Sequence, residues 1–300
     1  MSVCFDGETF ATESVPCDFC GGTQFHGLSN RSRHGVVMST VVCDCGLCQT
    51  MPRMNAESLA RFYHDFYHRF HGRTGVDASY LGKSRRMAER RITAITPLLP
   101  GPAKILEIGS GAGQFLVVAK ERSDWQACGI EPGQQSAAAC AAQGLDVRDA
   151  TVDTAEFPAA SFDAIVSFHV LEHLPSPSRF FEKAVRWLRP GGMLWVEVPN
   201  LTCPGGRLDT FFQLPHLYSF TAASLRNYFR KFGLDTRFLS EKPGALTLAG
   251  ISSGIILPAD KIDVEALLSH YRNNDRVRKL ARLIPRLPVL GKIRTTFEDV

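Results

Sequence analysis

The sequence predicts an α/β fold, a doubly wound parallel sheet, preceded by a small cysteine-rich module. Two observations predict this arrangement. From residue 103 onward, nearly continuous apolar runs typical of buried parallel strands alternate with segments of helical pattern. Before that point, six of the nine cysteines lie within the first 48 residues. The four apolar runs are KILEIG (104–109), ACGIEP (127–132), FDAIVSF (162–168) and GMLWVEVP (192–199).

Composition divides the 300 residues into four parts. We expect the cysteine-rich module over residues 1–54 and a helical bridge over 55–100, which ends at a proline-rich boundary. The α/β domain is expected over 101–258. Residues 259–300 are expected to form a last helix and a basic tail interrupted by prolines.

Helical periodicity predicts two helices in the bridge. One apolar stripe consists of Leu59, Phe62, Tyr63, Phe66 and Phe70. A second apolar face is predicted to contain Met87, Ile92, Ile95 and Leu98, opposite a basic face. In the α/β domain, helices are expected near 114–123, 134–143, 178–189 and 222–232, and two further strands near 236–241 and 246–257.

The composition also excludes some classes of protein. A net charge of +4 is too small to argue for nucleic acid binding by itself. No run of 18 apolar residues occurs, so no transmembrane helix is expected. The start, MSVCFDGETF, lacks the pattern of a secretory signal. We therefore expect a cytoplasmic protein, whose clustered cysteines serve a metal rather than disulfides.

A glycine-rich turn follows the first of the apolar runs. Gly109, Gly111 and Gly113 permit a tight turn and let a ligand approach the backbone. The next strand is followed by Glu131, 22 residues after Gly109. An acidic residue at about this distance accepts hydrogen bonds from ribose hydroxyls. The pattern therefore indicates a ligand that contains adenosine.

The glycine spacing favours one such ligand. The dinucleotide pattern G-x-G-x-x-G would place its third glycine at position 114, where this chain has Gln114. Here the spacing is G-x-G-x-G, and Glu107 lies two residues before the first glycine. A carboxylate suits an ammonium group better than a pyrophosphate. These residues resemble the first motif of class I S-adenosylmethionine (SAM)-dependent methyltransferases; NAD binding and an unliganded glycine turn are the alternatives.

The resemblance continues in order over residues 100–258. It includes GIEP after the second strand, VRDAT after the third, SFDAIVSFHVLEHLPSPSRF at the fourth and LRPGGMLWVEVPN at the fifth. It implies a Rossmann-like methyltransferase domain that binds SAM. The cofactor contacts that it implies are Glu107, Gly109, Gly111, Gly113, Glu131, Asp149, Ala150 and His169.

Three polar residues follow the fourth strand, at the edge where open α/β sheets bind ligands. His169 is placed to contact the cofactor or a substrate. Glu172 and His173 could take part in the chemistry or, equally, close a helix N-terminus by hydrogen bonds.

The cysteine-rich module contains two C-x-x-C pairs, Cys17–Cys20 and Cys45–Cys48, with 24 residues between them. Two such pairs place four thiolates around one tetrahedral zinc ion. Cys43 is an alternative ligand. VVCDCGLCQTMPRM resembles the zinc ribbon of a methyltransferase subfamily whose second pair reads C-x-x-C-G-L. This resemblance implies Cys45 as a ligand and leaves Cys43 or Cys48 as its partner. Independent buried thiols or a redox pair are the alternatives to zinc.

The segment LPHLYSFT (214–221) follows the fifth strand. It resembles an acceptor-site motif of zinc-ribbon-bearing sugar methyltransferases, in which a histidine lies near a tyrosine and a glutamate. His216 matches, but Pro215 replaces the glutamate, which weakens the case for C-methylation of a keto sugar. We predict His216 as the base that removes the acceptor proton and Tyr218 as the residue that orients the acceptor. The alternative is a structural histidine ahead of a helix with Thr221 as its N-cap.

The motifs favour methyl transfer to a small-molecule acceptor, namely a sugar, nucleotide sugar or related metabolite in glycan or natural-product biosynthesis. The alternatives are an RNA methyltransferase that reads nucleic acid with its ribbon and a catalytically silent cofactor-binding module. Residues 1–50 contain five acidic and two basic side chains, which argues against nucleic acid as a partner.

Two basic faces suggest further partners. A phosphate-bearing acceptor could be held by Arg85, Arg86, Arg90 and Arg91. The segment 272–294 contains eight basic residues and could make a weak contact with a membrane surface or a protein, although such a face is more often simply solvated.

Overall fold

The structure is a computed structural model that describes residues 2–30, 32–72, 77–122, 124–205 and 211–272. The chain divides into two compact units, Met1–Val264 and Glu265–Val300. Our division of the first unit at residues 54 and 100 stays a prediction. Apart from Arg272, the basic segment 272–294 lies outside the described residues. Across the described residues, no helix combines the length and the apolar character needed to cross a membrane.

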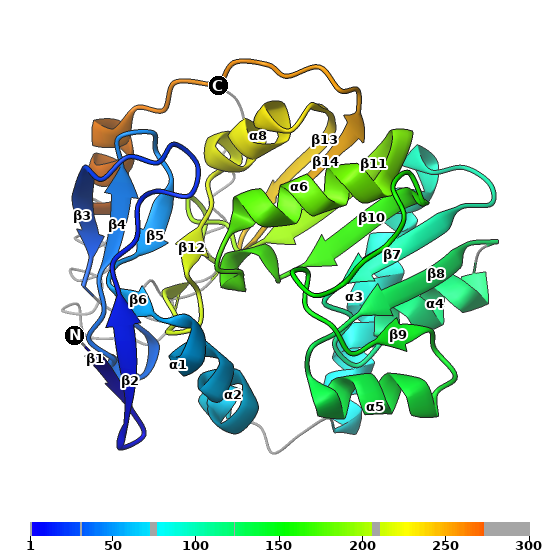
Figure 1. Cartoon of the computed structure of the whole chain (residues 1–300), viewed down its shortest axis with the longest axis horizontal. Coiled ribbons are helices and arrows are strands. Elements are labelled where there is room, and N and C mark those ends of the chain that lie inside the picture. The colour runs from blue at the N-terminus through cyan, green and yellow to red at the C-terminus, as the bar shows by residue number, and fades with distance from the viewer. Residues whose placement is uncertain (1, 31, 73–76, 123, 206–210, 273–300) are drawn as a thin grey trace, which may run out of the picture. The chain divides into compact units, whose positions relative to one another are not determined.

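A seven-stranded sheet forms the centre of the first unit, in the order β13-β14-β11-β10-β7-β8-β9 (Figure 1). The strands from β11 to β9 are parallel, and β14 is antiparallel to both of its neighbours. The predicted doubly wound α/β fold is thereby confirmed. The strands are β7 (Lys104–Ile108), β8 (Gln126–Ile130), β9 (Val147–Arg148), β10 (Phe162–Phe168), β11 (Leu188–Val198), β13 (Leu234–Lys242) and β14 (Ala245–Ser252).

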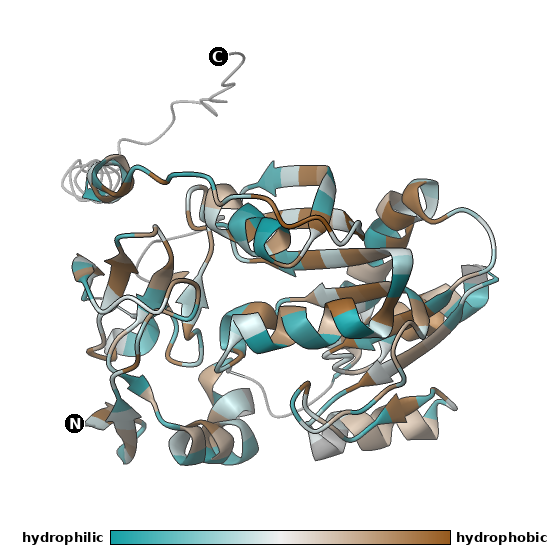
Figure 2. Cartoon of the chain, turned by 45° about the horizontal axis from the view of Figure 1, so that its top comes forward, coloured by the Kyte–Doolittle hydropathy of each residue, from teal (hydrophilic) through white to brown (hydrophobic). Residues whose placement is uncertain are grey.

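Helices cover both faces of this sheet. Neighbouring strand residues point to opposite faces, so Ile105 packs with α3 and α4, whereas Leu106 belongs to the core beneath α6 and α8. Figure 2 shows that apolar residues concentrate on the central strands. The helices are α3 (Ala78–Ile95), α4 (Gln114–Arg122), α5 (Gln134–Ala142), α6 (Pro177–Trp187) and α8 (Ala222–Lys231).

Two detailed expectations are wrong. Met87 was predicted on the buried face of α3 but is 41% exposed. Ala88, the next residue, is buried in its place, together with the predicted Ile92 and Ile95. The last strand ends at Ser252 rather than near 257. The carbonyl of Gly233 accepts hydrogen bonds from the N–H groups of residues 253 and 254, which turns the chain away from the sheet.

The bridge begins with three short helical turns in direct succession. Asn55 caps the first of them by accepting a hydrogen bond from the N–H of Ser58. Leu59, Phe62, Phe66 and Phe70 of the predicted stripe are buried, and Tyr63 is only partly buried. The turns are α1 (Ala56–Arg61), a π-helical turn (Phe62–Phe66) and α2 (Tyr67–Phe70).

The cysteine-rich module contains two small sheets. One has the order β1-β2-β6 and the other β12-β5-β4-β3. Strand β12 follows β11 in the chain, so the second sheet joins the module to the α/β domain (Figure 1). The strands are β1 (Ser2–Phe5), β2 (Glu8–Glu13), β3 (Phe25–Ser29), β4 (Thr40–Cys43), β5 (Cys48–Thr50), β6 (Arg53–Met54) and β12 (Tyr218–Ser219).

Candidate functional site

The glycine-rich turn lies between β7 and α4. Gly109 and Gly113 have φ values of 79° and 76°, in the left-handed region that favours glycine. A Cβ atom on Gly109 would lie 2.3 Å from Cγ2 of Val170, and one on Gly113 would lie 2.5 Å from Cδ1 of Leu145. Both the conformation and the close packing therefore require glycine, and the turn directly contacts the segment that follows β10.

Two carboxylates lie beside this turn. Glu107 is 4% exposed, and its buried Oε2 has no hydrogen-bond partner among the residues that the structure describes. Burial raises the pKa of Glu107 well above its usual value, although the positive charge of Arg91 opposes the shift. The carboxylate of Glu131 accepts hydrogen bonds from the N–H groups of Gly111 and Gly133, both at 2.9 Å. A ligand ammonium group would give Glu107 the partner that it lacks.

Asp149 and Ala150, two of the predicted cofactor contacts, lie at the same edge of the sheet as the glycine turn. They follow β9, which pairs with β8 through Ile130 and Arg148. Burial raises the pKa of Glu131, and the charge of Asp149 adds to this effect. Asp149 is exposed, whereas Ala150 is partly buried against the core. The structure thus brings these two residues near Glu131.

His169 follows β10 with a φ of 57°, which is unusual for a histidine. Its N–H donates to the Glu197 carbonyl at 2.7 Å, and its Nε2 lies 3.2 Å from Oε1 of Glu197. Its Nδ1 lies 3.6 Å from Oε1 of Glu172. Glu197 also pairs with Arg91, whose guanidinium lies over the Phe168 ring. His169 is therefore fixed between two carboxylates.

These contacts set the charges around His169. Burial lowers the pKa of His169, but the nearby carboxylates of Glu172 and Glu197 outweigh it and raise the value to about 9. Burial raises the pKa of Glu197, but His169 and Arg91 bring it down to about 2. At neutral pH, His169 is an imidazolium beside a carboxylate. His169 is therefore suited to provide a fixed positive charge in the site rather than to accept a proton.

The basic face that we expected to bind phosphate is partly used in ion pairs. Arg91 is held by Glu197, and Arg85 pairs with Glu121 and Glu89. These two guanidinium groups thus already have carboxylate partners within the chain. Arg86 and Arg90 are exposed.

His173 and His216 meet although they are 43 residues apart in the chain. Their ring centroids are 4.6 Å apart, and the ring planes are nearly perpendicular. The hydroxyl of Tyr63 is hydrogen-bonded to Nδ1 of His173 at 2.7 Å. Glu172 lies on the opposite side, with Oε1 3.7 Å from Nε2 of His173. Glu172 is 1% exposed, and neither carboxylate oxygen has a hydrogen-bond partner among the described residues.

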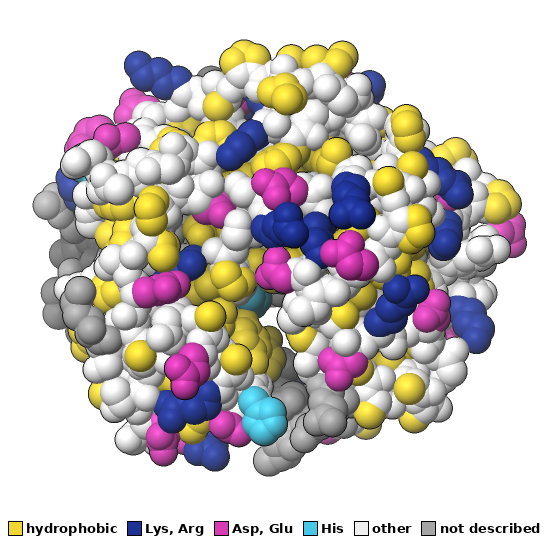
Figure 3. Space-filling view, viewed as in Figure 1, with side chains coloured by type: hydrophobic (Ala, Val, Ile, Leu, Met, Phe, Trp, Pro, Cys, Tyr) yellow, Lys and Arg dark blue, Asp and Glu magenta, His cyan; other side chains and the backbone are white. Residues whose placement is uncertain are grey.

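Both of these histidines are neutral at physiological pH. Burial lowers the pKa of His173. Burial also lowers the pKa of His216 well below its usual value, and the nearby positive charges of His169 and Arg33 add to the shift. Neutral imidazoles accept protons, so this pair is suited to act as a base. Figure 3 shows a hollow near the centre of the face that it draws, with hydrophobic and histidine atoms visible inside it.

Tyr218 lies elsewhere than we predicted. Its hydroxyl donates to the Pro175 carbonyl at 3.1 Å and accepts a hydrogen bond from Arg53 at 3.0 Å. Its ring is buried in the core. Tyr218 therefore joins the cysteine-rich module to the α/β domain, and Tyr63 is the tyrosine whose hydroxyl contacts the histidine pair. The sequence signal for Tyr63 is a single hydroxyl group within a stripe of phenylalanines.

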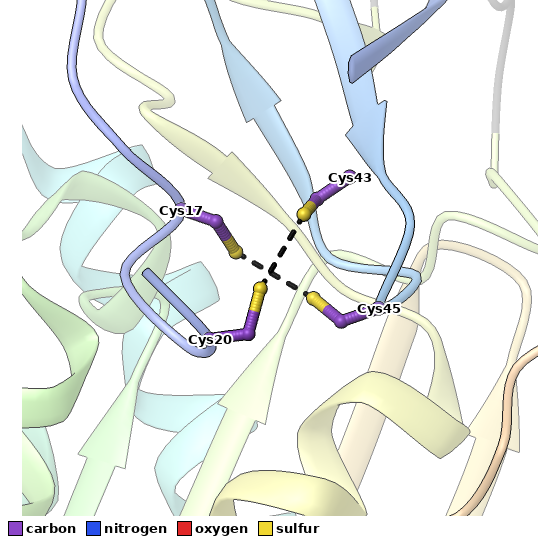
Figure 4. Close-up of side chains that lie close together, drawn as sticks. All are labelled: Cys17, Cys20, Cys43 and Cys45. Carbon is purple, nitrogen blue, oxygen red and sulfur yellow. Dashed lines mark hydrogen bonds between the residues drawn. The ribbon is translucent and has the colours of Figure 1, made fainter. Parts of the chain in front are cut away.

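Four cysteine sulfurs of the module converge on one point (Figure 4). The Sγ atoms of Cys17, Cys20, Cys43 and Cys45 all lie within 4.8 Å of one another. The Cys17–Cys45 and Cys20–Cys43 sulfur distances are both 3.5 Å. Sulfurs at about 2.3 Å from a tetrahedral metal are about 3.8 Å apart, so these four residues fit a metal ion.

Cys43 takes the place that we first assigned to Cys48. In the antiparallel pairing of β4 with β5, Cys48 lies opposite Val42 and therefore shares its face. Cys43 is the next residue and points to the other face, toward Cys20. The N–H of Cys43 donates to the Leu47 carbonyl, and the N–H of Gly46 donates to the Cys43 carbonyl. This tight turn brings Cys45 into the cluster and leaves Cys48 buried outside it.

The sheet order, the glycine turn and the carboxylates beside it define the fold of a class I SAM-dependent methyltransferase. A family model described as a methyltransferase domain matches residues 80–237. The chain belongs to this family.

Individual relatives agree with this assignment. A probable SAM-dependent methyltransferase of Mycolicibacterium smegmatis is 35% identical over 92 residues, which cover 30% of this chain and 35% of that protein. A ubiquinone biosynthesis O-methyltransferase of Bradyrhizobium diazoefficiens is 29% identical over 121 residues, covering 38% of this chain and 46% of that one. The chain thus spans about a third to a half of the length of these curated relatives.

A solved structure shows the same fold. It is a SAM-dependent methyltransferase, described as a possible histamine N-methyltransferase, from Thermotoga maritima. The match has a TM-score of 0.50 and 20% sequence identity, and it covers 65% of this chain and 99% of that one.

Proposed function

We propose that this protein transfers a methyl group from SAM to a small-molecule acceptor, a sugar, nucleotide sugar or related metabolite. The observation that carries the proposal is the neutral pair His173–His216 beside the glycine turn. Strands β7 and β10 are parallel neighbours, so their carboxyl ends lie at one edge of the sheet. The close approach of Gly109 to Val170 supports the assignment of both halves to one site.

The cofactor half of the site uses residues of the first three parallel strands. Glu107 would hold the ammonium group of SAM, and Glu131 would accept hydrogen bonds from its ribose hydroxyls. Asp149, Ala150 and His169 complete the cofactor-binding edge of the sheet. Bound SAM supplies an electrophilic methyl group, so these residues have to position it rather than activate it.

In the acceptor half, His216 takes the acceptor proton as methyl transfer proceeds. Its neutral imidazole gains a positive charge in this step, and the buried carboxylate of Glu172 stabilises that charge. His173 packs against His216 and is itself held by Tyr63. The proton thus moves from the acceptor to a nitrogen of His216.

We propose that the cysteine cluster binds zinc. Four sulfur ligands in a tetrahedral arrangement, with all positions filled by protein, are typical of structural zinc sites. The ion would then stabilise the module and would not take part in the methyl transfer.

Calorimetric titration tests the cofactor half of this proposal. We expect SAM to bind and NAD to show no binding. Glu131→Ala should weaken SAM binding about 10- to 100-fold, because the ribose hydroxyls lose a charged acceptor. Glu121→Ala, a change of the same type on α4 outside the proposed cofactor site, should leave the affinity unchanged. Binding of NAD without SAM would contradict the proposal.

A further inference from the structure

Asp18 lies between the two cysteines of the first C-x-x-C pair, and its carboxylate reaches the α/β domain. It accepts hydrogen bonds from the Ser176 hydroxyl at 2.6 Å, the Ser178 N–H at 2.8 Å and the Tyr228 hydroxyl at 2.7 Å. Ser176 is the N-cap of α6 and follows His173 by three residues. The first cysteine pair is therefore bonded to the segment that carries Glu172 and His173.

The second half of the cluster, Cys43 and Cys45, is connected to His216, the other histidine of the pair. Cys43 and Cys45 form the turn between β4 and β5, and β5 pairs with β12. The hydroxyl of Thr50, at the end of β5, donates to the His216 carbonyl at 2.8 Å, and its N–H donates to the Leu217 carbonyl. The backbone of His216 is thus held by the strand that follows this turn.

We propose that Asp18 is a positioning residue, through which the metal cluster holds the His173 segment in register with His216. The Cys17–Cys20 half of the cluster holds residues 171–178 through Asp18, and the Cys43–Cys45 half holds residues 214–221 through β5. With the ion bound, the cysteine pairs are fixed relative to each other, and both histidine-bearing segments are fixed with them. The role in methyl transfer rests on the proposed function, whereas the positioning itself does not.

The cofactor half should be independent of this connection. Glu131 is bonded to Gly111 and Gly133 within the α/β domain. Loss of the Asp18 contacts should therefore change the acceptor half and spare SAM binding. A general loss of folding would change both, so the two effects are distinguishable.

Asp44 provides a matched control. It lies between the two cysteines of the second half, Cys43 and Cys45, as Asp18 lies between the first two. Its side chain is exposed and is bonded to His26 within the module. Asp18→Ala and Asp44→Ala therefore each remove a carboxylate beside the same cluster, but among the described residues only the Asp18 carboxylate is bonded to the α/β domain.

The test is hydrogen–deuterium exchange on the zinc-loaded full chain, together with zinc content and SAM affinity. In Asp18→Ala, we expect exchange in residues 171–178 to rise about tenfold, with zinc and SAM binding unchanged. Asp44→Ala should match the wild type. Tyr228→Phe, which removes one of the three contacts and keeps the ring, should give a smaller rise.

Unchanged exchange in residues 171–178 of Asp18→Ala would overturn the proposal. So would an equal rise in Asp44→Ala. If an acceptor is in hand, kcat should fall about 10- to 100-fold in Asp18→Ala, because displaced catalytic groups lose their alignment. If no methyl transfer occurs in the wild type, the exchange result still decides the positioning role.

Discussion

Replacing Cys43 by serine is expected to abolish the zinc binding proposed for the cysteine cluster, whereas replacing Cys48 by alanine should preserve it. Cys43 contributes one of the four converging sulfurs, and Cys48 points to the opposite face of the same hairpin. Structural zinc sites bind with apparent free energies of about 10–16 kcal/mol in small zinc-finger peptides, and this binding energy contributes directly to folding. We therefore expect Cys43→Ser to lower the melting temperature by about 10 °C or more.

Elemental analysis and thermal unfolding check this prediction. The wild type and Cys48→Ala should contain one zinc ion per chain, and Cys43→Ser should contain none. Cys48 is fully buried, so its alanine variant should lose only a little stability through the cavity that it creates. Zinc retained in Cys43→Ser but lost in Cys48→Ala would show that the second ligand pair is Cys45–Cys48 after all. A metal-free wild type that is fully folded would exclude zinc as a structural ion.

Replacing His216 by alanine will abolish most methyl transfer and leave SAM binding intact. A positioned general base contributes about 100- to 10,000-fold to a rate, and His216 is the buried neutral histidine next to Glu172 and His173. Its side chain belongs to the acceptor half of the site, so the cofactor affinity should stay unchanged. His64→Ala is the control, because that side chain is 81% exposed on the helical bridge. Unchanged turnover in His216→Ala would make His216 structural.

The pH dependence gives a second measure of the same role. A base acts in its neutral form, and burial lowers the pKa of His216 well below its ordinary value of about 6.5. The rate should therefore stay level as the pH falls from about 8 to about 6.5, and decline only at lower pH. A rate that halves near pH 6.5 would show that the base is a histidine with an ordinary pKa.

Much of the α/β domain could be predicted from the sequence. Buried parallel strands are continuous apolar runs, and the glycine turn lies between one of them and a helix. The linear sequence therefore reveals both. Glu107 and Glu131 are found by their distance along the chain from that turn. Thr221 also caps α8 as predicted, since a capping residue acts on its own neighbours.

The site assignments that the sequence left open, missed or misplaced depend on contacts between distant segments. Cys43 and Cys48 are distinguished by the register of β4 against β5, which the spacing of cysteines does not contain. Tyr63 meets His173 across 110 residues of chain. Arg91 was assigned to a surface that binds phosphate because its partner, Glu197, lies 106 residues away. In each case the type of residue suited the predicted chemistry, but which residue of that type lies in the site is decided by the tertiary fold.

The most direct measurement is mass spectrometry of candidate acceptors incubated with the protein and SAM. Sugars, nucleotide-diphosphate sugars and RNA would be tested separately, and S-adenosylhomocysteine would be measured in each reaction. We predict that a sugar or nucleotide sugar gains the mass of one methylene group while S-adenosylhomocysteine accumulates. Methylation of RNA, with every sugar acceptor unchanged, would contradict the proposed function.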